Sequence, residues 1–202
     1  MMPQTLNTDP GAVGTPQAPK RPPGEAGVWV FILVEMSVFT ALFAALLWGR
    51  GNNPDMFSRG QAILNRPLGL INTIVLIAGS VLVVLAIDAA QGDRYRQASH
   101  YLVAAMSCGA GFVVIKAMEY GLALRHGMWI HTNTFWMMFF VITGAHLLHV
   151  LVGVTVLGLV HRRTATGLPG ARDRELFISA TCYWHMVDLL WLVIFPLFYL
   201  VN

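Results

Sequence analysis

Long apolar stretches alternate with short polar connections along this chain. Five stretches are long enough to cross a membrane as helices, because about 20 apolar residues rising about 1.5 Å each span the hydrocarbon layer. They cover residues 28–48, 68–90, 99–124, 133–160 and 176–201. Their interiors lack the strict two-residue alternation of a membrane β-barrel. The pattern predicts an all-α integral membrane protein: a bundle of five transmembrane helices, forming one domain over residues 28–202.

Composition supports this interpretation. Of 202 residues, 56% are apolar and only 11% are charged, whereas soluble domains average about 25% charged residues. Residues 1–27 are rich in Pro, Gly, Thr and Gln and are predicted to form a disordered tail. They lack the features of a removable signal peptide, so the first span is expected to persist. Cys108 and Cys182 lie inside predicted spans and indicate no disulfide framework.

The basic residues indicate an orientation rather than a nucleic-acid partner, although the isoelectric point is about 9.1. They are scattered over short loops and form no basic stripe with interleaved aromatic residues. Eight lie on the side of the N-terminal tail, against four on the opposite side. The positive-inside rule therefore predicts a cytoplasmic N-terminus and, after five crossings, a periplasmic or extracellular C-terminus.

Several ionisable side chains fall inside the predicted spans. An ionisable group at the centre of a spanning helix costs about 2.5 to 3.5 kcal/mol on insertion scales, so each one needs a partner or a function. The first span contains one such residue, and the third, fourth and fifth each contain two that are three residues apart. They are Glu35, Lys116, Glu119, His146, His149, His185 and Asp188.

The three-residue spacing places both members of each pair on one helix face. Lys116 and Glu119 are expected to neutralise each other or to reach the interface. His146 and His149 suit either metal binding or hydrogen bonds to neighbouring helices, and we favour the hydrogen bonds.

His185 and Asp188 suit either a proton relay or a buried structural pair, and we favour the structural pair. Glycines on the third and fourth spans predict close helix packing. Aromatic residues near the predicted span ends are expected to anchor the helices at the membrane surface. These aromatic residues are Trp29, Trp48, Trp129, Tyr183, Trp184 and Tyr199.

No motif in the chain specifies a reaction: it has no Gly-rich phosphate loop and no haem-attachment motif. Two functions remain open from the residues alone. A stand-alone proton or ion carrier would use Glu35, Lys116, Glu119 and Asp188 as relay groups. A b-type cytochrome would use His146 or His149 as an axial ligand.

Five segments, in this order, resemble subunit III of the haem-copper respiratory oxidases. They are WVFILVEM (29–36), NT (72–73), EY (119–120), TGAHLLHV (143–150) and YWHMVDLLW (183–191). The chain is similar to the five-helix form of that family, and it departs from the usual pattern at Val34 and at Lys116, where Ser and Gln are typical. The branch stays open between cytochrome c oxidases, quinol oxidases and the relatives that accompany nitric oxide reductases.

The resemblance implies an accessory subunit of an oxidoreductase complex, without catalytic residues, haem or copper of its own. Haem and copper are expected in partner subunits, namely catalytic subunit I and other oxidase subunits. The resemblance also implies a location in the inner membrane of a bacterium, with membrane lipids as neighbours. It allows a bound phospholipid, although the lipid cleft of the longer family members involves two helices that this chain lacks. By motif position, structural and interface roles are implied for Glu35, Asn72, Glu119, His146, His149, His185 and Asp188.

Overall fold

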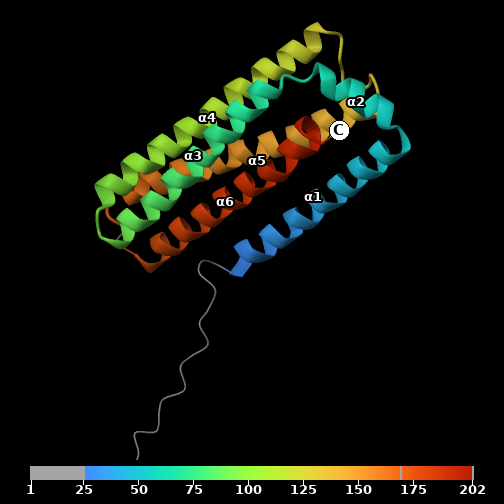
Figure 1. The fold of residues 1–202 in the computed structure, drawn as a ribbon. Coiled ribbons are helices and arrows are strands. Elements are labelled where there is room, and N and C mark those ends of the chain that lie inside the picture. Colours follow the sequence, from blue (N-terminus) through green and yellow to red (C-terminus); the bar gives the residue numbers. More distant parts are fainter. Residues whose placement is uncertain (1–25, 169, 202) are drawn as a thin grey trace, which may run out of the picture.

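The computed structural model describes residues 26–168 and 170–201 and shows six helices in that part of the chain (Figure 1). They are α1 (Ala26–Asn52), α2 (Pro54–Ile63), α3 (Arg66–Gln91), α4 (Tyr95–Arg125), α5 (Thr134–Thr164) and α6 (Ala171–Tyr199). All except α2 are long and apolar enough to cross a membrane. The prediction of five spanning helices is therefore confirmed, and most of the helices extend a few residues beyond the predicted bounds. The predicted disordered tail lies almost entirely outside the described residues.

Helix α2 is the element that the apolar pattern did not predict. It occupies the connection between the first two spans and is only 10 residues long. Pro54 begins it, where a missing N–H costs nothing. Phe57, Gly60 and Gln61 share its buried face, at the spacing of one helical turn. A short helix of this kind lies across the end of the bundle (Figure 1), and it was missed because it is too short and polar to resemble a span.

Helices α3, α4, α5 and α6 form a closed four-helix ring. Within it α3 contacts α4, α4 contacts α5, α5 contacts α6, and α6 contacts α3. Helix α1 lies outside this ring and packs along α5 and α6 (Figure 1). Two ring helices begin at asparagine caps: the side-chain oxygen of Asn65 accepts from Leu68 N (3.2 Å), and that of Asn133 accepts from Trp136 N (3.0 Å), as expected at helix N-termini.

The indole of Trp184 fills a slot lined by glycines from three other helices. A Cβ added to Gly109 on α4 would lie 2.8 Å from the ring. At Gly153 on α5 and Gly79 on α3 the corresponding distances are 3.1 and 3.5 Å. Trp184 itself is fully buried. The close packing predicted for glycines of the third and fourth spans is confirmed at Gly109 and Gly153, where one large side chain needs small neighbours. At Gly111, Gly144 and Gly158 an added Cβ would make only ordinary contacts of 3.5 to 3.9 Å.

Three of the six aromatic residues predicted as membrane-surface anchors are instead buried. Trp48, Trp129 and Trp29 are exposed, as expected, but Tyr183, Trp184 and Tyr199 are between 0% and 7% exposed. All three buried residues are on α6, the most enclosed of the spanning helices. Position near a span end did not distinguish them, because burial depends on which helices surround α6.

The last turn of α6 is held by residues from α1 and α2. Gln61 Nε2 donates to the carbonyl oxygens of Leu197 (3.3 Å) and Val201 (2.8 Å), and Arg50 Nη2 donates to the same Val201 oxygen (2.5 Å). The last carbonyls of a helix lack partners within the helix. The contact of Gln61 with Leu197 supplies such a partner, and the contacts with Val201, two residues after α6, connect the end of the ring to α1 and α2.

Candidate functional site

Glu35 on α1 and His149 on α5 form a contact between the two helices. The distance from Glu35 Oε2 to His149 Nε2 is 3.0 Å, and His149 Nδ1 lies 2.7 Å from the carbonyl oxygen of Ala145. A carbonyl can only accept, so Nδ1 carries a hydrogen. The second contact then needs one more proton, either on Nε2 or on the Glu35 carboxyl. The interhelical hydrogen bond predicted for His149 is confirmed, and Glu35 is its partner.

Lys116, Glu119 and Tyr199 form a closed cluster, here named the Lys116 triad. Lys116 Nζ donates to Glu119 Oε2 (2.7 Å) and to the Tyr199 hydroxyl (3.1 Å), and that hydroxyl donates to Glu119 Oε1 (2.5 Å). Lys116 is 0% and Glu119 only 3% exposed. The predicted pairing of Lys116 with Glu119 is confirmed, and the pair lies in the interior rather than at the membrane surface.

Aromatic rings surround the Lys116 ammonium group. Its Nζ lies 4.9 Å from the ring centroids of Phe139 and Trp191 and 5.6 Å from those of Tyr120 and Tyr199. Ring faces attract a cation at such distances. The charge is therefore balanced by one carboxylate and by aromatic faces from three helices.

His146 does not make the hydrogen bond that the sequence predicted. It is 0% exposed, and neither ring nitrogen has a partner among the described residues. Its ring stacks on Trp191 at a centroid distance of 5.2 Å and meets the edge of Phe112 at 5.4 Å. Residues three apart differ by about 60° in direction around a helix, because three residues turn it by about 300°. This offset allows the His146 side chain to be enclosed by the four-helix ring while the His149 side chain contacts Glu35 on α1.

His185 and Asp188 do not hydrogen-bond to each other. His185 Nδ1 instead lies 2.8 Å from the Ser80 hydroxyl on α3. Asp188 is 6% exposed, and neither of its carboxylate oxygens has a hydrogen-bond partner among the described residues. Asn72 on α3 is likewise buried, with both amide atoms unpartnered in that part of the chain. The expected self-satisfied pair is therefore wrong, and its two members face different neighbours.

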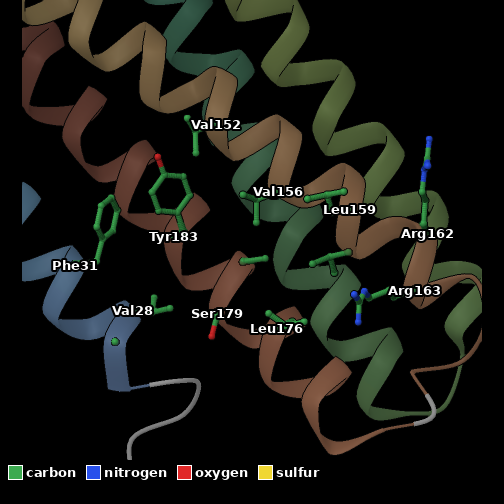
Figure 2. A pocket seen from close by; sticks show the side chains of 13 residues that line it. Val28, Phe31, Val152, Val156, Leu159, Arg162, Arg163, Leu176, Ser179 and Tyr183 are labelled. Atoms are coloured by element: carbon green, nitrogen blue, oxygen red, sulfur yellow. The ribbon is translucent and has the colours of Figure 1, made fainter.

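An apolar groove of about 750 Å³ separates the first part of α1 from α5 and α6 (Figure 2). Phe31 approaches it from α1, Val156 from α5 and Tyr183 from α6, as Figure 2 shows. Arg162 and Arg163 lie at one end, where Arg163 Nη1 donates to Asp173 Oδ1 (2.6 Å). The groove is therefore apolar along its walls, with two arginines at one end.

Sequence reasoning did not identify Tyr199, Ser80 or Trp191 as partners of the buried polar groups. Trp191 Nε1 donates to Thr73 Oγ1 (3.0 Å), and this bond connects α6 to α3. Thr73 and Trp191 lie in the segments that resemble the subunit III family, so the sequence did offer a reason to single them out. Nothing in the sequence distinguished Ser80. Within residues 26–168 and 170–201, no group of three or more His, Cys, Asp or Glu is placed to hold a metal ion.

Five apolar helices long enough to span a membrane, around buried charged and polar groups, define a multi-pass integral membrane protein. The family of cytochrome c oxidase subunit III matches residues 24–202. The chain belongs to this family, and the resemblance drawn from the five sequence segments is confirmed.

Three relatives illustrate the breadth of the match. Cytochrome c oxidase subunit 3 of Thermostichus vulcanus is 32% identical over 177 residues, covering 87% of this chain and 86% of that protein. Probable quinol oxidase subunit 3 of Staphylococcus saprophyticus is 27% identical, covering 87% and 88%. Heme-copper oxidase subunit I+III of Aeropyrum pernix is 30% identical over 182 residues, and the match covers 87% of this chain but 22% of that longer protein.

Proposed function

We propose that the chain is the non-catalytic subunit III of a bacterial haem-copper oxidase and binds the catalytic subunit I of that enzyme. The observation that carries this proposal is the family match over residues 24–202, which includes all five spanning helices. The Aeropyrum pernix relative supports subunit I as the neighbour, because its name joins subunits I and III in one chain. In this proposal haem and copper belong to partner subunits, and this chain holds neither.

The buried polar groups support a structural role for this subunit. Glu35 is engaged with His149, and Glu119 with Lys116 and Tyr199. Groups that are bonded to one another across helices hold a bundle together, which leaves them poorly placed to act as independent relay groups. We assign them to maintaining the shape that meets subunit I, with proton uptake supported indirectly.

The orientation follows from the loop charges. We place the first turn of α1 and the α5–α6 connection on the cytoplasmic side of the inner membrane, and the α4–α5 connection on the outside. Arg162, Arg163, Arg172 and Arg174 then face the cytoplasm. We assign the enzyme to the cytochrome c oxidase type, with a quinol oxidase as the alternative, since relatives with both names match over similar lengths.

The groove beside α1 is assigned to a phospholipid. Its walls are apolar side chains of α1, α5 and α6, and arginines lie at the end that this orientation places at the cytoplasmic surface. Arginine forms charge-assisted hydrogen bonds with phosphate. An acyl chain between α1 and the four-helix ring would fill space that the protein leaves open.

Purification from native membranes tests the subunit assignment. A tag on this chain should retain a larger haem-bearing partner, identified by mass spectrometry together with the absorbance spectrum. The separated chain should show no Soret band and should transport no protons in liposomes. A Soret band stoichiometric with the isolated chain would contradict the proposal, and proton transport by the isolated chain would favour a carrier.

A variant distinguishes a structural role from a catalytic one. Asp188→Leu should reduce the amount of partner retained while the complexes that do form keep their turnover. The exposed Asp88 provides the control, because Asp88→Leu should leave both quantities unchanged. An intact Asp188→Leu complex without turnover would contradict the structural assignment.

A further inference from the structure

The interior of the four-helix ring contains more polar atoms than the protein itself satisfies. Among the described residues, seven buried side-chain atoms of four ring residues have no hydrogen-bond partner: both amide atoms of Asn72, both ring nitrogens of His146, Trp184 Nε1 and both carboxylate oxygens of Asp188. Nearly all buried polar groups in proteins are paired with protein or with ordered water. In a membrane, bulk water cannot reach them from the sides.

Three of these four residues, Asn72, His146 and Asp188, are connected to Trp191. His146 stacks on the Trp191 ring, and Trp191 donates to Thr73, the residue after Asn72. Asp188 precedes Trp191 by three residues on α6, which places it one turn away on the same face. Asn72, His146 and Asp188 thus lie on α3, α5 and α6, each close to Trp191 in contact or in sequence, whereas Trp184 lies about two helical turns before Trp191.

Their chemistry is complementary to that of water. The Asn72 amide and the Trp184 indole offer N–H donors, Asp188 offers acceptors, and neutral His146 offers one of each. The Ser80 hydroxyl on α3 lies 2.8 Å from His185 Nδ1. Water is both donor and acceptor and typically makes about three hydrogen bonds when buried.

A cavity at one end of the bundle extends to the Lys116 triad, which neighbours Trp191. A cavity of about 200 Å³ is lined by Asn65, His126 and Trp136 together with Glu119. Its volume exceeds the share of about 30 Å³ that one molecule occupies in liquid water. Glu119 is bonded to Lys116, whose ammonium group lies 4.9 Å from the Trp191 ring centroid. The cavity therefore reaches the charged cluster next to the unpartnered atoms.

We propose that the four-helix ring binds internal water among Asn72, His146 and Asp188, beside Trp191, and that this water enters from the cavity at Glu119. The bound water completes the hydrogen bonds of the buried groups and joins α3, α5 and α6 at mid-membrane. The ring then contains a hydrated polar site of its own, separate from the apolar groove beside α1.

Cryo-electron microscopy of the complex that copurifies with this chain tests the site directly, at a resolution that shows ordered water. The expected result is water density within hydrogen-bond distance of at least two of Asn72, His146 and Asp188. Direct hydrogen bonds among these side chains, with no water between them, would overturn the proposal.

A His146→Phe variant gives an independent test, because a hydrated site and a dry site predict opposite changes in stability. Phenylalanine keeps the aromatic ring and removes both nitrogens. If water binds His146, the variant loses that density and the complex dissociates at a lower temperature, because the water loses a partner. If the nitrogens are unpartnered in a dry site, removing them raises the dissociation temperature or leaves it unchanged, and the proposal fails.

Phe112→Leu serves as the matched control. It alters the packing against the same His146 ring but adds or removes no polar atom. This variant should lower the dissociation temperature through packing alone and should retain the water density. Loss of water in Phe112→Leu together with its retention in His146→Phe would also overturn the assignment.

Discussion

Helix α1 and the helices of the four-helix ring are all apolar enough to cross a membrane, but they are held by different forces. In the most apolar 18 residues of α1, 11% of the residues are buried, against 67% in α6. The ring is held by close packing around Trp184 and by buried hydrogen bonds. Helix α1 is held by the Glu35–His149 contact, by the Arg50–Val201 contact and by ring contacts such as that of Phe31 with Tyr183. Hydropathy therefore predicts which segments cross the membrane but does not predict how firmly each is attached.

The difference has a physical cause in the solvent. Lipid tails are as apolar as leucine, so burying an apolar side chain against another helix gains little over leaving it in lipid. Helix association then depends on fit and on polar contacts. The four-helix ring has both close packing and polar contacts. Helix α1 has one polar contact near its middle, and the groove beside it leaves part of its surface unpacked. Changes in the ring should accordingly cost more than changes in α1.

The largest effect is expected from Lys116→Met. Methionine fills the space of the aliphatic chain of Lys116 but leaves the Glu119 carboxylate buried without its cation. Breaking a buried ion pair in this way typically costs about 3 to 5 kcal/mol. We expect the subunit to be lost from the purified complex. The double variant Lys116→Met/Glu119→Gln, which removes both charges, should recover much of this loss. Equal losses in the single and double variants would show that packing, rather than charge, dominates the Lys116 triad.

A smaller effect is expected from Gly109→Ala. The added Cβ would lie 2.6 Å from Val154 Cγ2 and 2.8 Å from the Trp184 ring, and overpacking of this kind costs about 1 to 3 kcal/mol. Thermal dissociation of the complex measures it. Gly121→Ala on the same helix is the control, because nothing lies within 4 Å of its added Cβ. Equal dissociation temperatures for the two variants would mean that the packing around Trp184 accommodates an added methyl group without loss of stability.

Glu35→Leu tests the attachment of α1, with an expected cost of about 1 to 2 kcal/mol for the hydrogen bond to His149. Amide hydrogen exchange should rise in α1 and stay unchanged in α3 and α4. Glu35→Gln should restore protection, since its amide can donate to His149 Nε2 when His149 Nδ1 donates to Ala145. Faster exchange throughout the ring in Glu35→Leu would contradict the view that α1 is attached independently.

The sequence predicted the five spans and the family because both depend on local patterns: runs of apolar residues and short motifs. It also predicted the Lys116–Glu119 pair, since a three-residue spacing is a local property of a helix. The same spacing failed for His185 and Asp188. His185 instead contacts Ser80 on another helix, and nothing local in the sequence specifies which helix faces either residue.

The third member of the Lys116 triad shows the same limit. Tyr199 lies 80 residues after Glu119, and its place near a span end is equally typical of an interfacial anchor. Only the packing of α6 inside the ring decides between these roles. Helix α2 was missed for a different reason, because its 10 residues form an amphipathic helix across the bundle end rather than a span.

The smallest effect is expected at the surface, where Arg94 Nη2 lies 2.8 Å from Asp88 Oδ2. The two side chains are 53% and 73% exposed, and exposed ion pairs contribute about 0 to 1 kcal/mol because water and salt screen them. Arg94→Gln should therefore leave the dissociation temperature and the α1 exchange rates unchanged within error. A decrease in dissociation temperature comparable to that of Gly109→Ala would mean that the turn between α3 and α4, where Asp93 has a φ of 56°, contacts a partner subunit. The four-helix ring alone would then no longer account for the stability of the subunit.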